Sequence, residues 1–288
     1  MNCKKSKRHI HFMKGIIKRV LMALIAMLKW EKKIPVVSVK SPHNLLEDKV
    51  ALITGGSGGI GMAIAKSLLE SGCKVILAGT NEQKLKKSVD KLSSDTKYIV
   101  IDMNDPTSFD LKIKEAASNF GNIRLFVCSA GVHSEGLDFL RMTEKEYDRV
   151  MDINLKGTYF FAQSVAKYLI GNNLKGKLLF VSSSRGSEPA WSPYGISKWG
   201  LDGMVKGLAK ELFPYGINVN AIAPGSTATN LLGYKKGDSI YTDDNSECRM
   251  VMPEEIGNLT NLLLSDAGNM INGEIIHISS GRGVYDIR

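Results

Sequence analysis

A tyrosine and a lysine four residues apart, Tyr194 and Lys198, are the side chains in this sequence best suited to proton transfer. If the segment that opens at Tyr194 is a helix running to about residue 213, the phenol and the ammonium share one face. A phenol with a pKa near ~10 is a poor base at neutral pH. A cation about 4 Å away contributes roughly 4 kcal/mol at an effective dielectric constant near 20, enough to bring that pKa toward ~7. The spacing therefore predicts an acid–base tyrosine, with a surface pair as the alternative.

A glycine-rich segment at residues 54–61, Thr-Gly-Gly-Ser-Gly-Gly-Ile-Gly, has the composition of a phosphate-binding turn. It follows an apolar run and precedes a segment with helical periodicity at residues 62–70. Glycines let the backbone approach a pyrophosphate, and the helix N-terminus supplies free N–H groups and a positive dipole end. The context between strand and helix predicts dinucleotide binding, with an ordinary flexible loop as the alternative.

The end of the second apolar run indicates which dinucleotide binds. An acidic residue that reads the ribose is expected about 20 residues after the glycines. The chain has Gly79, Thr80 and Asn81 there instead, so no carboxylate repels a 2′-phosphate. NADP(H) is therefore predicted over NAD(H), with Thr80 and Asn81 as neutral donors. The nearby Glu82 and the lack of an arginine in the turn or after Gly79 favour NAD(H).

Seven apolar, β-branched runs alternate with stretches of helical periodicity along residues 46–288. Strands that are apolar throughout and each followed by a helix predict a parallel sheet covered on both faces, with right-handed crossovers. We therefore expect a single α/β domain with a doubly wound, Rossmann-type sheet. Ligands of such sheets lie at the carboxyl ends of the strands. The expected strands are residues 50–54, 74–78, 98–101, 123–127, 178–181, 217–222 and 274–278.

The net charge of +9 belongs to the N-terminal extension, residues 1–45. Residues 1–40 hold eleven lysines and arginines and one acid, a net charge of +10 (11 − 1), which leaves −1 (9 − 10) for residues 41–288. A nucleic-acid-binding fold would carry its basic side chains on the body. The distribution therefore argues against a nucleic-acid partner.

Apolar residues in the extension recur at helical spacing among lysines and arginines. The uninterrupted apolar run at 20–28 is far shorter than the roughly 20 residues that span a bilayer, and no small-x-small cleavage site follows it. We expect a basic amphipathic helix in peripheral contact with an anionic membrane. A helix packed on the body or on a subunit neighbour, and a wrongly chosen start codon, are the alternatives. The apolar positions are Ile16, Ile17, Val20, Leu21, Leu24, Met27 and Leu28.

The four cysteines, Cys3, Cys73, Cys128 and Cys248, are far apart and match no metal-ligand or redox spacing. Reduced thiols in the cytoplasm are therefore expected, and no metal site.

With its further motifs the chain resembles the short-chain dehydrogenase/reductase family over residues 48–284. The matching pieces stand in order: the turn at 54–61, Asp102, Cys-Ser-Ala-Gly at 128–131, Asn154, Ser183, Tyr194 with Lys198, and Ala-Pro-Gly at 223–225 followed by Thr229. Near the C-terminus Ser-Ser-Gly at 279–281 stands where the family often has Asp-Gly-Gly, and Cys-Ser at 128–129 replaces two asparagines.

The resemblance implies a four-residue catalytic site. Tyr194 would be the acid in ketone reduction and the base in alcohol oxidation, and Lys198 would lower its pKa and bind the nicotinamide ribose. Ser183 would hydrogen-bond the substrate oxygen. It is chosen over its two serine neighbours because Gly186 follows at the Ser-x-x-Gly interval. Asn154 would hold a water that links Lys198 to solvent, or stabilise the backbone at a kink.

Cofactor contacts are implied along the whole chain. Asp102 would accept from the adenine amino group, although a turn or helix-capping aspartate is an equal alternative. The set is Gly55, Ser57, Gly58, Gly59, Ile60, Gly61, Thr80, Asp102, Met103, Ser129, Ala130, Gly131, Tyr194, Lys198, Pro224, Gly225, Thr227 and Thr229.

The function expected is NAD(P)-dependent interconversion of a ketone and a secondary alcohol. His133 and Trp191 would form the substrate wall with Ser183 and Tyr194, and the polar segment 226–249 favours a small polar substrate. A 3-oxoacyl-carrier-protein reductase shares these motifs and is the alternative. A non-catalytic dinucleotide-sensing or scaffold protein is a further one. Sugar-nucleotide epimerases fit less well, since their glycine spacing differs and they have a large C-terminal domain. The family also implies a homodimer or homotetramer through the helices that bear Asn154 and Tyr194.

Overall fold

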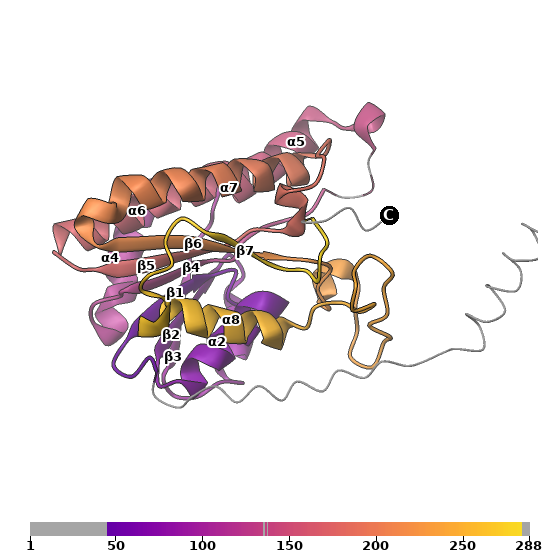
Figure 1. The fold of residues 1–288 in the computed structure, drawn as a ribbon. Coiled ribbons are helices and arrows are strands. Elements are labelled where there is room, and N and C mark those ends of the chain that lie inside the picture. Colours follow the sequence, from indigo (N-terminus) through magenta and orange to yellow (C-terminus); the bar gives the residue numbers. More distant parts are fainter. Residues whose placement is uncertain (1–44, 135, 137, 284–288) are drawn as a thin grey trace, which may run out of the picture.

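The computed structural model describes residues 45–134, 136 and 138–283, and the predictions for residues 1–40 lie outside this part of the chain. Its centre is a parallel seven-stranded sheet in the order β3-β2-β1-β4-β5-β6-β7 (Figure 1). The predicted doubly wound α/β fold is thereby confirmed. The strands are β1 (Val50–Thr54), β2 (Lys74–Gly79), β3 (Thr96–Val100), β4 (Leu125–Cys128), β5 (Gly176–Val181), β6 (Ile217–Pro224) and β7 (Ile275–Ile278).

Helices cover both faces of the sheet. On one face lie α2 (Gly59–Glu70), α3 (Glu82–Val89) and α8 (Pro253–Leu264). On the other lie α4 (Phe109–Phe120), α6 (Thr158–Gly171) and α7 (Pro193–Leu212), with α5 (Glu144–Met151) beside α7 (Figure 1). Alternate residues of a strand point to opposite faces, so Leu52 packs in the α4–α6–α7 layer while Ala51 and Ile53 pack in the α2–α8 layer.

The strand order reverses between β1 and β4, and this reversal creates the crevice for a ligand. Thr54, the last residue of β1, pairs with Ala78 of β2 on one side and with Cys128 of β4 on the other. The segments that follow these three strands therefore emerge side by side at one edge of the sheet. They include the glycine turn and residues 129–131.

Six of the seven strands begin or end one or two residues away from the predicted bounds, and two of these shifts have a clear cause. β4 begins at Leu125 rather than at residue 123, because the Ile123 N–H bonds to the Tyr168 hydroxyl of α6 at 3.2 Å and not to a strand. β3 begins at Thr96, since two polar residues extend the pairing with β2 beyond the apolar run.

The helix with the Tyr–Lys pair has clear start and stop signals. Ser192 caps α7 by accepting the Gly195 N–H at 3.2 Å, and Pro193 occupies its first turn, where no N–H is needed. A short 3-10 turn after α7 ends at Gly216, which has a left-handed φ of 67°. Within the described residues, no helix combines the length and the apolar character that crossing a membrane requires.

Candidate active site

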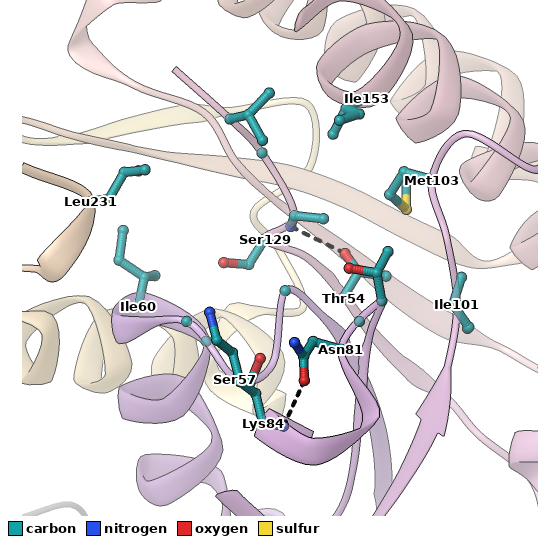
Figure 2. A pocket seen from close by; sticks show the side chains of 18 of the residues that line it. Thr54, Ser57, Ile60, Asn81, Lys84, Ile101, Met103, Ser129, Ile153 and Leu231 are labelled. Atoms are coloured by element: carbon teal, nitrogen blue, oxygen red, sulfur yellow. Dashed lines mark hydrogen bonds between the residues drawn. The ribbon is translucent and has the colours of Figure 1, made fainter. Parts of the chain in front are cut away.

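A cavity of about 550 Å³ opens at the carboxyl ends of β1 to β4, where the strand order reverses. Figure 2 shows Ser57 and Ile60 of the glycine turn, Met103 after β3 and Ser129 after β4 around one space. Thirteen of the predicted cofactor residues line it: Gly55, Ser57, Gly58, Gly59, Ile60, Gly61, Thr80, Asp102, Met103, Ser129, Ala130, Gly131 and Thr229.

The glycine turn fits a phosphate group. The N-cap of α2, Gly58, provides no side-chain cap, so the first N–H groups of this helix are left for a ligand. Gly55 has a φ of +65°, and a Cβ there would lie 2.9 Å from the Ala130 backbone. A Cβ on Gly59 would lie 2.7 Å from the Thr229 methyl group. Only glycine therefore fits at these two positions of the turn. A turn without side chains also lets its backbone approach a pyrophosphate closely.

The first turn of α3, just after β2, places a cation in this cavity, and the sequence did not predict it. Asn81 caps α3 by accepting the Lys84 N–H at 2.9 Å. Lys84 then lies in the first turn of the helix and lines the cavity with its side chain (Figure 2). Among the residues that the structure describes, Lys84 is the one basic side chain in the lining of this cavity, and Asp102 is the one acidic side chain. The Asp102 carboxylate accepts the Asn104 N–H at 2.9 Å, so it stabilises its own turn and also faces the cavity.

A second cavity, of about 180 Å³, adjoins the first and shares Ile60, Thr229 and Leu231 with it. Ser183, Tyr194 and His133 line it, with the predicted cofactor residues Pro224, Gly225 and Thr227. The His133 ring stacks on the Tyr194 ring, with 3.8 Å between centroids and 18° between planes. Burial, with the charges of Lys198 and Arg185, lowers the pKa of His133 below its usual range. The ring therefore serves as a neutral wall at pH 7.

Ser183 is the serine of its triplet that reaches the tyrosine. Its hydroxyl lies beside Tyr194 and acts to lower the pKa of the phenol, while Ser182 donates to the Asp202 carboxylate. Ser184 is buried in the 3-10 turn that follows. The two hydroxyls of Ser183 and Tyr194 thus lie together at a cavity large enough for a carbonyl group.

The ammonium of Lys198 lies over the ring of Tyr194 and is held by a backbone carbonyl. Its ammonium donates to the Val181 carbonyl at 2.8 Å and lies 5.7 Å from the centre of the tyrosine ring. Burial raises the pKa of Tyr194, against the Ser183 hydroxyl and the charge of Arg185. Burial is the largest influence on the tyrosine in this structure, and the role of Lys198 in lowering its pKa stays a prediction.

Asp202 is a second residue that the sequence analysis missed. It lies one helical turn beyond Lys198 on the same face of α7, and the i, i+4 spacing is the signal that could have found it. Burial lowers the pKa of Lys198 to about 8, and the Asp202 carboxylate acts against this change. Burial also raises the pKa of Asp202, opposed by Ser182 and Lys198.

Asn154 lies in a π-helical turn, residues Asp152–Gly157, between α5 and α6. Its amide pairs with both backbone groups of Val132, accepting the N–H at 2.8 Å and donating to the carbonyl at 2.9 Å. It also donates to the Ser197 hydroxyl at 3.3 Å. Asn154 therefore ties the segment before His133 to α7. Its role in holding a water stays a prediction.

Trp191 is 52% exposed and is not among the residues that line the second cavity, so its place in a substrate wall also stays a prediction. Arg282, which was not predicted, does line this cavity. It donates to the Ser226 hydroxyl at 2.6 Å, contacts Asp244, and pairs with Glu188 at 2.9 Å. The segment that holds Arg282 therefore joins the loops on both sides of the second cavity.

Comparison with known proteins agrees with this geometry. The family model for short chain dehydrogenases matches residues 49–239. The chain belongs to the short-chain dehydrogenase/reductase family and is an NAD(P)-dependent oxidoreductase acting on a carbonyl or an alcohol.

Among its curated relatives is the 3-oxoacyl-[acyl-carrier-protein] reductase FabG of Rickettsia felis, 37% identical over 245 residues, covering 82% of this chain and 97% of the relative. The enzyme of the same name from Aquifex aeolicus is 32% identical, with 82% and 98% covered. Similar solved structures include the 3-ketoacyl-(acyl-carrier-protein) reductase of Brucella melitensis complexed with NADH, with a TM-score of 0.77, 25% identity, and 83% and 100% covered. Levodione reductase has a TM-score of 0.76, 26% identity, and 83% and 100% covered.

Proposed function

We propose that this protein is a cytoplasmic reductase of 3-oxoacyl groups carried on an acyl carrier protein, with NADPH as the reductant. The observation that carries the chemistry is the pair of Ser183 and Tyr194 hydroxyls in the lining of one cavity, which adjoins the dinucleotide cavity. The names of the curated relatives support the substrate class. They favour this reading over the more general ketone reductase.

The residues of the chain divide the work as follows. Reduction adds a hydride to the carbonyl carbon, supplied by the nicotinamide when it is bound, and a proton to the oxygen. The Tyr194 hydroxyl gives that proton, and its raised pKa keeps it protonated at neutral pH. The Ser183 hydroxyl donates to the same oxygen as negative charge develops there. Lys198 holds the ribose, with its ammonium set by the Val181 carbonyl and Asp202.

The rim of the second cavity supports an acyl substrate. Leu231 and Leu232 line it and remain 59% and 44% exposed. Ser226, Thr227 and Thr229 of the same segment line the cavity beside this apolar pair, whereas Lys235 and Tyr241 do not. The segment therefore offers the site both polar and apolar side chains. A small free ketone is the second candidate, and the modest volume of about 180 Å³ favours it.

NADPH is proposed over NADH because Lys84 is the one cation in the described lining of the dinucleotide cavity and lies beside Asn81, a predicted neutral donor to the 2′-phosphate (Figure 2). Lys84→Gln should weaken NADPH binding by about tenfold, since charge-assisted hydrogen bonds contribute ~1.5–3 kcal/mol and this side chain is exposed. NADH binding should stay unchanged. Lys87→Gln, on the same helix but outside the cavity, is the matched control. Equal losses for both dinucleotides would contradict the assignment.

The central experiment follows NADPH absorbance with 3-oxoacyl carrier protein, with 3-oxoacyl coenzyme A and with small free ketones. Tyr194→Phe should lower kcat by at least about 100-fold while leaving NADPH binding intact, as loss of a general acid predicts. Tyr147→Phe on α5, whose side chain lines neither cavity, is the control. Retained turnover in Tyr194→Phe would refute the proposal. Binding of NADPH without turnover of any substrate would favour a dinucleotide sensor.

We also propose a homodimer built on the helices that carry Asn154 and Tyr194. An apolar groove lies between α6 and α7, with Leu155 and Met204 in its lining. Tyr159 and Phe160 of this lining stay 47% and 38% exposed, so the groove offers apolar side chains to a partner. Sedimentation of wild type and Tyr159→Glu should show a dimer and a monomer. A monomeric wild type would contradict the dimer.

A further inference from the structure

A third cavity, of about 650 Å³, lies at the amino ends of the strands, the edge of the sheet opposite to the active site. Four basic side chains line it, Lys49, Arg124, Lys175 and Lys177, against one acid, Asp266, so its net charge is +3 (4 − 1). Residues 41–288 together carry only −1 (9 − 10). The positive charge is therefore concentrated here and does not follow from the composition of the body.

Two of these cations are held by the fold and two face outward. The Lys49 ammonium pairs with Asp266 at 2.9 Å, and the Lys177 ammonium donates to the Leu263 carbonyl at 3.1 Å. Arg124 and Lys175 are exposed, and neither takes part in an ion pair among the residues that the structure describes. Both guanidinium and ammonium are therefore available to an anion outside the protein.

Apolar side chains border the same cavity. Phe213 and Met270 line it and are 70% and 95% exposed. Tyr215, in the same 3-10 turn as Phe213, is 53% exposed. We call these three residues, with Arg124 and Lys175, the amino-edge patch. Cations interspersed with exposed aromatic and apolar groups match the interface of an anionic bilayer, where phosphates meet the acyl region.

The N-terminal extension joins the fold at this edge. The described chain begins at Leu45, the Leu46 N–H bonds to the Ser71 carbonyl at 2.9 Å, and Lys49 lines the cavity three residues later. Residues 1–40 carry a net charge of +10 (11 − 1), so the extension and the patch repel each other. The positive charge of the extension therefore disfavours its binding in this positively charged cavity. An anionic surface, however, attracts both.

We propose that the amino-edge patch docks the folded domain on an anionic membrane surface. Its cations are attracted to the lipid phosphates, and its exposed apolar side chains fit the boundary with the acyl chains. The dinucleotide and substrate cavities open at the carboxyl edge of the sheet. They therefore face away from the membrane and stay open to a carrier protein or a small substrate in the cytoplasm.

The test is co-sedimentation of the full chain with phosphatidylcholine vesicles, with and without phosphatidylglycerol. Wild type should bind the anionic vesicles and release them at high salt. Arg124→Glu with Lys175→Glu should weaken binding by about 30-fold or more, since each cation near such a surface contributes ~1 kcal/mol. Phe213→Ser with Met270→Ser should weaken binding without any change of charge.

The matched control is Lys114→Glu with Lys145→Glu, which changes the net charge equally at exposed sites on α4 and α5. It should keep binding within about threefold. An equal loss of vesicle binding in both charge variants would overturn the proposal, because binding would then depend on the net charge of the protein and not on the patch. Wild-type binding in the patch variants would assign attachment to the extension alone.

Binding of soluble glycerol phosphate without binding of vesicles would also overturn the proposal, in favour of a site for a free anion. A fluorescence titration with NADPH checks that every variant is folded, because the dinucleotide cavity shares no lining residue with the patch. A variant that binds NADPH as wild type does but not vesicles supports the membrane contact.

Discussion

The turn after β1 gives the sharpest prediction, because one methyl group added there meets two separate obstacles. Gly55 has a φ of +65°, a conformation that costs a residue with a Cβ about 1–2 kcal/mol. The new Cβ would also lie 2.9 Å from the Ala130 Cα and N, and overpacking of this kind costs roughly 1–3 kcal/mol. Gly55→Ala should therefore destabilise the protein by about 2–5 kcal/mol in total.

Gly233→Ala separates the two costs. Gly233 also has a positive φ, +78°, but nothing lies within 4 Å of its added Cβ. In thermal unfolding, this control should lose about 2–8 °C and Gly55→Ala about 4–20 °C, at ~2–4 °C per kcal/mol. Gly55→Ala alone should also weaken NADPH binding, since the clash pushes the β1 and β4 turns apart. Equal losses of Tm in the two variants would refute the argument from crowding.

Two further outcomes follow from the buried titratable groups. Asp202→Asn should move the alkaline limit of kcat to lower pH, because the carboxylate opposes the burial that lowers the pKa of Lys198 to about 8; a limit that stays or rises would contradict this. Alkylation followed by peptide mass spectrometry should find Cys248 modified before Cys73 and Cys128, since burial raises the pKa of both of the latter to about 12 and the thiolate is the reactive form; urea should abolish the difference.

The fold could be predicted from sequence because its signals are local. Most strands are short apolar runs that can be recognised within a few residues of sequence. The seven-stranded parallel sheet predicted from them is confirmed. The start of β4 could not be predicted in this way. Ile123 continues the apolar run, but its N–H bonds to Tyr168, 45 residues away. Such a contact depends on how α6 packs against the sheet.

The same distinction holds for the site. Residues in the turns directly after strands, such as Ser57 and Ala130, line the dinucleotide cavity as predicted, because parallel strands bring their carboxyl ends together. The position of Lys84 in the cavity depends on where α3 begins. The position of Arg282 depends on the path of the C-terminal segment, which the sequence does not reveal. The direction in which Lys198 points depends on a backbone carbonyl, which residue spacing does not report.

The ion pairs of Arg282 with Glu188 and Asp244 also imply an order in which the site is completed during synthesis. Glu188 is made first, Asp244 second and the arginine that joins them last. Until that residue emerges, the loops on either side of the substrate cavity lack the cation that draws their carboxylates together. The dinucleotide cavity is lined by residues up to Leu231 only. A nascent chain therefore holds the parts for its cofactor before it has those that close around its substrate.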